Sequence, residues 1–137
     1  MKKKIFELID NSIHYPVPKV VFLTNPTEYG TIYSKEEIRE ITEHAHSKEM
    51  RVHLDGARLY NAAAEKGWSL KECTRDLGVD SLSLGGTKNG LLFGEAVIFF
   101  NEDQAKGFER IVKQGMQLGS KMRFIGCQFT EMLSADL

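Results

Sequence analysis

Apolar positions along this chain follow two different periods, and each period predicts one kind of element. Short continuous runs of β-branched and aromatic residues predict buried strands over Lys19–Thr24, Arg51–Asp55, Asp80–Leu84 and Glu95–Phe100. Apolar residues at helical spacing predict helices over residues 3–13, 34–48, 57–66, 69–77, 103–114 and 121–133. Ser34 with Glu37, and Ser69 with Glu72, have the spacing of capping boxes that open two of these helices.

The order of these elements predicts an α/β fold. Strands that alternate with helices form parallel β/α units, so the first three strands are expected to be parallel. Only about ten residues and no helix separate the last two strands, which predicts an antiparallel pair. The expected architecture is a three-layer sandwich, with a mostly parallel sheet that contains one antiparallel strand. The apolar run Lys19–Thr24 is expected to be buried on both faces.

Composition and charge narrow the function classes. The 137 residues are 42% hydrophobic and 27% charged, which is typical of one globular domain. The net charge of −1 at pH 7 gives no electrostatic case for binding nucleic acid or an anionic membrane. No apolar run approaches the ~20 residues that a transmembrane helix needs. Cys73 and Cys127 form neither a metal pattern nor a disulfide framework, so we expect reduced thiols, a cytoplasmic protein and no metal site.

Polar residues follow the predicted strands at their carboxyl ends, where open α/β sheets bind ligands. Asn25, Asp55 and the loop Gly85–Gly90 all lie there. Asp55 is either a turn residue or a carboxylate that faces the protonated nitrogen of a pyridine ring and keeps that ring cationic. Alternation places His53 on the same strand face, where it either supports Asp55 or is an ordinary core histidine.

Lys88 lies in a loop of small residues, with the sequence GGTKNG. A lone lysine in a loop is usually solvated. Small neighbours, however, let the backbone approach a ligand closely, and the Thr87 hydroxyl can donate to a phosphate. The loop lacks the first glycine and the directly following helix of a nucleotide-binding P-loop, so that motif is excluded.

Arg58 lies on the first turn of the helix predicted after Asp55. Its planar guanidinium suits bidentate binding of a substrate carboxylate, and the alternative is a surface ion pair. Glu28 and Tyr29 lie in a loop at the same expected edge of the sheet, so they are candidates for ligand contact.

Two segments, HLDGARLYNA from His53 and SLSLGGTKNGLLFGEAVIFF from Ser81, together resemble the threonine aldolase and beta-eliminating lyase family. These are fold type I pyridoxal phosphate enzymes, and the resemblance covers residues 15–131. It implies part of a pyridoxal phosphate-dependent transferase-like large domain. It also implies Lys88 as the Schiff-base lysine, Asp55 as the partner of the ring nitrogen and Arg58 as the ligand of the substrate carboxylate. Thr87 would lie near the phosphate, and His53 near the cofactor.

Members of this family are longer than the present sequence. Their upstream phosphate loop and ring-stacking histidine, and their downstream small domain, have no match here. We therefore expect residues 1–137 to form a single partial domain that carries the cofactor-bearing half of a site. Sheet edges and faces that lack their neighbours predict association into a homo-oligomer.

The resemblance implies a lyase that acts on an amino acid, cleaving a β-hydroxy amino acid to glycine and an aldehyde. Two alternatives stay open. One is elimination of a side chain by the same cofactor chemistry, and the other is a non-catalytic fragment that acts as a folded interaction module.

Overall fold

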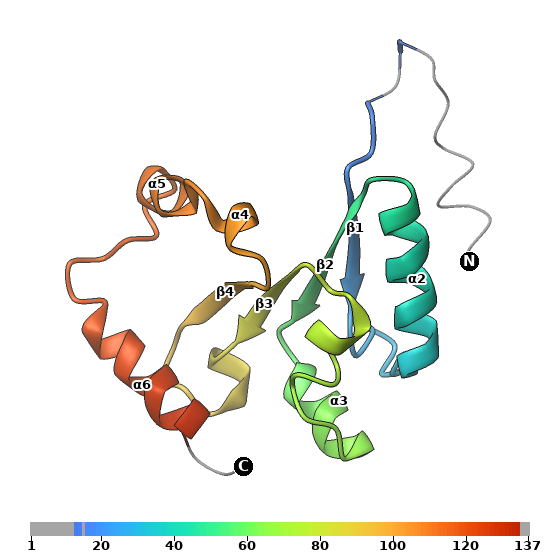
Figure 1. The fold of residues 1–137 in the computed structure, drawn as a ribbon. Coiled ribbons are helices and arrows are strands. Elements are labelled where there is room, and N and C mark those ends of the chain that lie inside the picture. Colours follow the sequence, from blue (N-terminus) through green and yellow to red (C-terminus); the bar gives the residue numbers. More distant parts are fainter. Residues whose placement is uncertain (1–12, 15, 135–137) are drawn as a thin grey trace.

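The chain forms one four-stranded sheet, seen in a computed structural model that describes residues 13–14 and 16–134 (Figure 1). The strands lie side by side in chain order. They are β1 (Val20–Thr24), β2 (Arg51–Gly56), β3 (Ser81–Gly85) and β4 (Glu95–Phe99). The first three strands are parallel and β4 is antiparallel to β3, which confirms the predicted α/β class and the mixed sheet.

The register aligns the carboxyl ends of the parallel strands at one edge of the sheet. Thr24 pairs with Asp55, and Asp55 pairs with Ser83. The loops that follow β2 and β3 therefore leave the sheet next to one another, as expected for a ligand site in this fold class.

In the view of Figure 1, α2 and α3 lie beside β1 and β2, whereas α4, α5 and α6 lie toward the β4 edge of the sheet. The helices are α2 (Lys35–Ser47), α3 (Leu59–Lys66), α4 (Glu102–Ala105), α5 (Phe108–Gln114) and α6 (Arg123–Ser134). The predicted capping box opens α2, because Ser34 accepts from the Glu37 amide and the Glu37 carboxylate accepts from the Ser34 amide. Among the described residues, no helix is long and apolar enough to cross a membrane.

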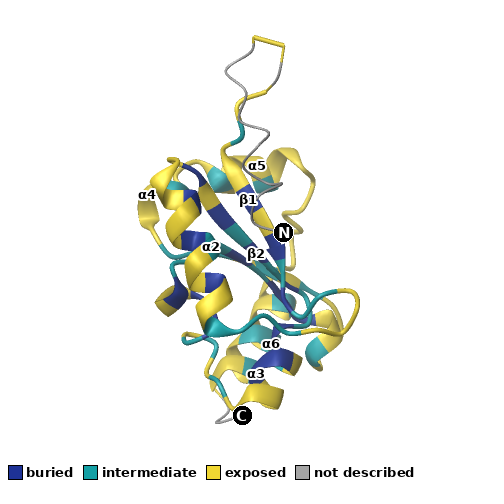
Figure 2. Ribbon diagram, turned by 90° about the vertical axis from the view of Figure 1, so that its right-hand side faces the viewer, coloured by how far each residue is buried: buried dark blue, intermediate teal, exposed yellow. Residues whose placement is uncertain are grey.

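The hydrophobic core lies between the sheet and the pair of helices α2 and α3. Figure 2 shows the buried positions alternating along the strands, and Val52 and Leu54 of β2 are completely buried. Ile38 of α2 and Leu59 of α3 are also completely buried and belong to the same cluster. Each such side chain contributes ~1.5–3 kcal/mol on burial, so this one face stabilises the sheet.

The opposite face of the sheet is polar in its centre and partly open. It carries His53 and Asp55, whereas Val20 and Phe22 of β1 are 56% and 63% exposed. The prediction that Lys19–Thr24 is buried on both faces was therefore wrong. The described residues cover only the face that contains Val21 and Leu23, and an apolar run cannot reveal which neighbours are present.

Two predicted helices differ from the observed elements. The Ser69–Glu72 capping bonds form, but turns follow and only the 3₁₀ helix η1 (Arg75–Leu77) precedes the left-handed Gly78. Thr74 leaves the helical region with φ −134° and ψ −88°, and its hydroxyl bonds back to the Leu70 carbonyl.

The helix predicted over residues 103–114 is split into α4 and α5. Gly107 takes a φ of +79° between them, and this left-handed conformation interrupts a right-handed helix. Asn101 caps α4 as predicted, accepting from the Asp103 amide. The helix predicted over residues 3–13 lies outside the described residues except for its end at Ile13.

Candidate functional site

Asp55 lies near the carboxyl end of β2 on the open face of the sheet. One carboxylate oxygen, Oδ1, accepts a hydrogen bond of 2.9 Å from the Ala57 amide, which fixes the turn that leaves the strand. None of the described residues donates a hydrogen bond to the second oxygen. The structure thus shows Asp55 as a turn residue. Its role beside a ring nitrogen stays a prediction, for which the second oxygen is available.

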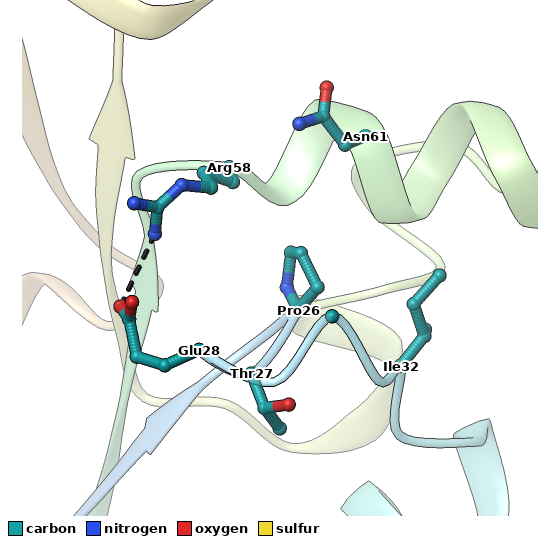
Figure 3. A pocket seen from close by; sticks show the side chains of 7 residues that line it. Pro26, Thr27, Glu28, Ile32, Arg58 and Asn61 are labelled. Carbon is teal, nitrogen blue, oxygen red and sulfur yellow. Dashed lines mark hydrogen bonds and ion pairs between the residues drawn. The ribbon is translucent and has the colours of Figure 1, made fainter.

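Arg58 lies directly before α3 and lines a pocket of about 410 Å³. Figure 3 shows the guanidinium and the Glu28 carboxylate pointing toward one another, 3.3 Å apart. The pocket is lined by Pro26, Thr27, Glu28, Gly30, Ile32, Arg58 and Asn61. The Glu28 side chain is 74% exposed, so this ion pair is weak and a ligand carboxylate can replace it. Tyr29, the other loop candidate, is 95% exposed.

Lys88 lies in the 3₁₀ helix η2 (Thr87–Asn89), which follows β3. Its side chain is exposed, and its ammonium forms no hydrogen bond or ion pair with any residue that the structure describes. The loop is closed as a hairpin, because the Gly86 and Thr87 amides both donate to the Gly94 carbonyl. Lys88 is thus presented by a closed loop while its amine stays available.

Gly85 brings the loop of Lys88 against the loop that follows Asp55. A Cβ atom at Gly85 would lie 2.6 Å from the Ala57 carbonyl oxygen and 2.7 Å from the Ala57 Cα. No side chain fits at such distances, so glycine is required for this close approach. The two loops that carry Asp55, Arg58 and Lys88 are therefore in direct backbone contact.

Thr87 uses its hydroxyl within its own loop. Oγ1 accepts from the Gly94 amide at 3.0 Å and contacts the Gly94 carbonyl at 3.4 Å. This pair of contacts helps to close the hairpin. A role at a phosphate stays a prediction for this residue.

His53 is held between two serine hydroxyls on the open face. Its Nδ1 lies 2.8 Å from the Ser81 Oγ and its Nε2 lies 2.9 Å from the Ser83 Oγ. Burial lowers the pKa of His53, and the nearby Asp55 carboxylate only partly opposes this effect. Burial thus favours the neutral form of this histidine beside Asp55. The Phe22 ring packs against it, with ring centroids 5.0 Å apart.

Ser81 and Ser83 were not identified from the sequence as part of this group. The signal was present, because alternation in SLSLG places both hydroxyls on one face. Asn25 was expected among the polar residues at the ligand-binding ends of the strands, but in the structure it has a structural role. Its side chain is buried at 1% exposure, and its Oδ1 accepts from the Tyr33 amide, so it supports the loop after β1.

The described residues contain no group of three or more His, Cys, Asp or Glu side chains able to hold a metal ion. The polar groups at this edge are instead one available carboxylate, one exposed lysine and one arginine. This set suits an organic ligand that carries a cationic ring nitrogen, a group reactive toward amines and a carboxylate partner.

Comparisons with known proteins bear on the same residues. The sequence model of the beta-eliminating lyase family matches residues 2–133. The low specificity L-threonine aldolase of Pseudomonas aeruginosa is 46% identical over 124 residues, which cover 90% of this chain and 36% of that protein. The low-specificity L-threonine aldolase of Candida albicans is 42% identical over 90 residues, covering 63% of this chain and 24% of its relative.

A solved structure of a threonine aldolase from Leishmania major has the same fold. It superposes with a TM-score of 0.85 at 32% identity, over 93% of this chain and 37% of that one. The present chain thus corresponds to part of a longer protein in each comparison. The family match covers most of the chain and includes both loops of the site, so this chain belongs to the beta-eliminating lyase family.

Proposed function

We propose that this chain forms part of the active site of a pyridoxal phosphate-dependent carbon–carbon lyase of the threonine aldolase type. Such an enzyme cleaves a β-hydroxy amino acid to glycine and an aldehyde. The observation that carries the proposal is the contact between the Asp55 and Lys88 loops at the carboxyl edge of the sheet. The names of the similar proteins support the same activity.

The residues present fit this cofactor. When bound, pyridoxal phosphate supplies a cationic ring that accepts electrons from the bond broken in the substrate. Asp55 has one oxygen without a hydrogen bond from the described residues, and this oxygen would hold the proton on the ring nitrogen. Lys88 would provide the amine that attaches the cofactor, because its ammonium has no partner among the described residues. Burial lowers the pKa of His53, so its imidazole would compete less with the ring nitrogen for the Asp55 carboxylate.

Arg58 would bind the substrate carboxylate in the pocket of Figure 3. The guanidinium already contacts one carboxylate there, that of Glu28, at 3.3 Å. A substrate carboxylate makes two parallel hydrogen bonds to the same fork, which gives it an advantage over a single exposed contact. Thr87 would lie beside the cofactor phosphate.

Cofactor attachment tests this proposal directly. The chain is incubated with pyridoxal phosphate, reduced with borohydride and mapped by mass spectrometry. We expect the label on Lys88 and its loss in Lys88→Ala, whereas Lys113→Ala, which changes an exposed lysine on α5, should keep the label. A label that persists in Lys88→Ala would contradict the assignment.

The family match also leaves side-chain elimination as a candidate. The two reactions differ in product, because cleavage of threonine releases glycine whereas elimination leaves a 2-oxo acid. Supplying threonine and a β-substituted alanine to the cofactor-loaded protein, and identifying the products, decides between them.

The exposed apolar residues of β1 favour a further candidate, a folded interaction module without catalysis. Saturable binding of pyridoxal phosphate to the chain would exclude this candidate. The same apolar surface supports the proposal of a homo-oligomer, which sedimentation would detect. Cys73 and Cys127 are both free thiols, and this supports a cytoplasmic location.

A further inference from the structure

We infer that Asn89 is a positioning residue that clamps the loop of Lys88 to the loop of Asp55 and Arg58. This inference rests on the proposed function for its chemical meaning, but the clamp itself is a feature of the fold. The Asn89 Nδ2 donates at 2.6 Å to the Gly85 carbonyl and at 3.3 Å to the Ala57 carbonyl. One side-chain nitrogen therefore joins two segments that are far apart in the sequence.

The clamp continues directly to the Asp55 carboxylate. Ala57 donates its amide to Asp55 Oδ1 at 2.9 Å and accepts from Asn89 through its carbonyl. A connected set of hydrogen bonds thus runs from the Asp55 carboxylate through Ala57 to Asn89 and Gly85. Lys88 is the covalent neighbour of Asn89, so the same bonds fix where the Lys88 backbone lies relative to Asp55.

The clamp depends on the chemistry of the asparagine amide. Both carbonyls need a donor, and the Nδ2 group carries two N–H bonds on one atom. Aspartate has the same size but only acceptors, so it would place negative charge against two carbonyl oxygens. Gly85 adds a second requirement, because only a residue without a Cβ lets the Ala57 carbonyl come this close.

The hydrogen bonds that close this loop, from the Gly86 and Thr87 amides to the Gly94 carbonyl, join it to its own hairpin and not to Ala57. The 3₁₀ helix η2 is three residues long. The Asn89 amide at its end and the Leu91 amide beyond it both donate to the Gly86 carbonyl, at 2.9 and 3.2 Å. A displacement of about 1 Å between reacting groups lowers rates strongly, because catalysis needs both groups placed together. Asn89 would therefore set the distance between the cofactor-attaching amine and the carboxylate at the ring nitrogen.

Hydrogen exchange of the unloaded chain tests the clamp independently of the cofactor. We expect the Asn89 and Leu91 amides to exchange about tenfold faster in Asn89→Asp than in the parent. Asn101→Asp is the matched control, because Asn101 uses only its Oδ1, which accepts from Asp103, and aspartate keeps that acceptor. Unchanged exchange in Asn89→Asp would overturn the clamp. Asn89→Ala, which removes the donors without adding charge, gives the same reading if the aspartate variant does not fold.

The rate of cofactor attachment then tests positioning. We expect borohydride-trapped label on Lys88 to accumulate about tenfold more slowly in the Asn89 variants than in Asn101→Asp. Faster exchange with an unchanged attachment rate would overturn the positioning role and leave a purely structural contact. A parent chain that attaches cofactor at no lysine would overturn the proposed function and the positioning role together, while the exchange result still decides whether the clamp exists.

Discussion

Two aspartates, at opposite ends of neighbouring strands, show how differently one fold uses the same side chain. Asp80, directly before β3, is 9% exposed, and its two oxygens accept from His46, Val52, Arg51 and Gln104. Asp55, at the opposite end, accepts one hydrogen bond from the described residues, that of the Ala57 amide. The first carboxylate is saturated by the fold, whereas the second retains an oxygen for a ligand.

The two aspartates therefore have different roles: Asp80 stabilises the fold, whereas Asp55 keeps an oxygen available for a ligand. Asp80 connects α2, β2 and α4 through its partners, so the fold depends on its charge. Asp55 contributes one turn bond and can change its partner without loss of packing.

Asp80→Ala should lower the free energy of unfolding by about 3 kcal/mol, because it leaves the buried Val52 amide and the Gln104 amide without an acceptor. Asp55→Ala should lower it by less than about 1 kcal/mol, since only one partly buried bond is lost. Urea unfolding of both variants measures the difference. Equal losses would remove the contrast.

Asp55→Asn should weaken binding of pyridoxal phosphate about tenfold to a hundredfold, because a charge-assisted contact to the ring nitrogen is lost. Stability should stay near that of the parent, since the asparagine oxygen can still accept from the Ala57 amide. Titration of the chain with cofactor, followed by absorbance, gives the affinity. Unchanged affinity would show that Asp55 is only a turn residue.

Lowering the pH should destabilise the fold in two separate ranges, one set by His53 and the other by Asp80. Burial lowers the pKa of His53 in the folded chain below its ordinary value of about 6.5. As the pH falls below this value, the unfolded chain binds the proton first, so the free energy of unfolding falls. His53→Gln should remove this part of the loss. Burial alone would raise the pKa of Asp80, but the hydrogen bonds from His46, Val52 and Gln104 outweigh it and lower that pKa.

The contribution of Asp80 is therefore fully present above the ordinary aspartate range, about pH 3.9, and is lost as the pH falls through the lower native value. Urea midpoints measured across both ranges would show two steps. An Asp80→Asn variant that keeps the lower step would contradict the assignment.

Glu28→Gln should have the smallest effect. We expect the affinity for a substrate carboxylate to rise about twofold to fivefold, which corresponds to the energy of one exposed ion pair. The neutral amide competes less for Arg58, and the ion pair at 3.3 Å is largely exposed. Binding of threonine to the cofactor-loaded protein measures this gain. A loss of affinity would show that Glu28 assists binding instead of competing with it.

The sequence predicted the elements of the site better than their contacts. Strands β2 and β3, the antiparallel β4 and the positions of Asp55 and Lys88 at strand ends all follow from local patterns. The contacts of His53 with Ser81 and Ser83 depend on strand register, which one sequence does not specify. The ion pair of Arg58 with Glu28 depends on the path of a loop in the same way.

The predictions that the structure contradicts have equally local causes. The prediction of one helix over 103–114 did not account for Gly107, whose left-handed conformation splits the segment into two helices. The exposure of Phe22 reflects neighbours that a pattern of apolar residues does not report. The loop sequence identifies Asn89 only as a small residue, because its two acceptors depend on distances that one sequence does not specify.

The hairpin of β3 and β4 implies an order of assembly for the site. The Gly86 amide reaches the Gly94 carbonyl through a short local loop, and hairpins of this kind form in about 1–10 μs. The parallel pairing of β2 with β3, such as His53 with Ser81, closes a separation of 28 residues and is expected to form later. Pulsed hydrogen exchange during refolding should protect the Gly86 amide before the Asp80 amide, which donates to Val52. The lysine-bearing half of the site is thus shaped before the carboxylate-bearing half arrives beside it.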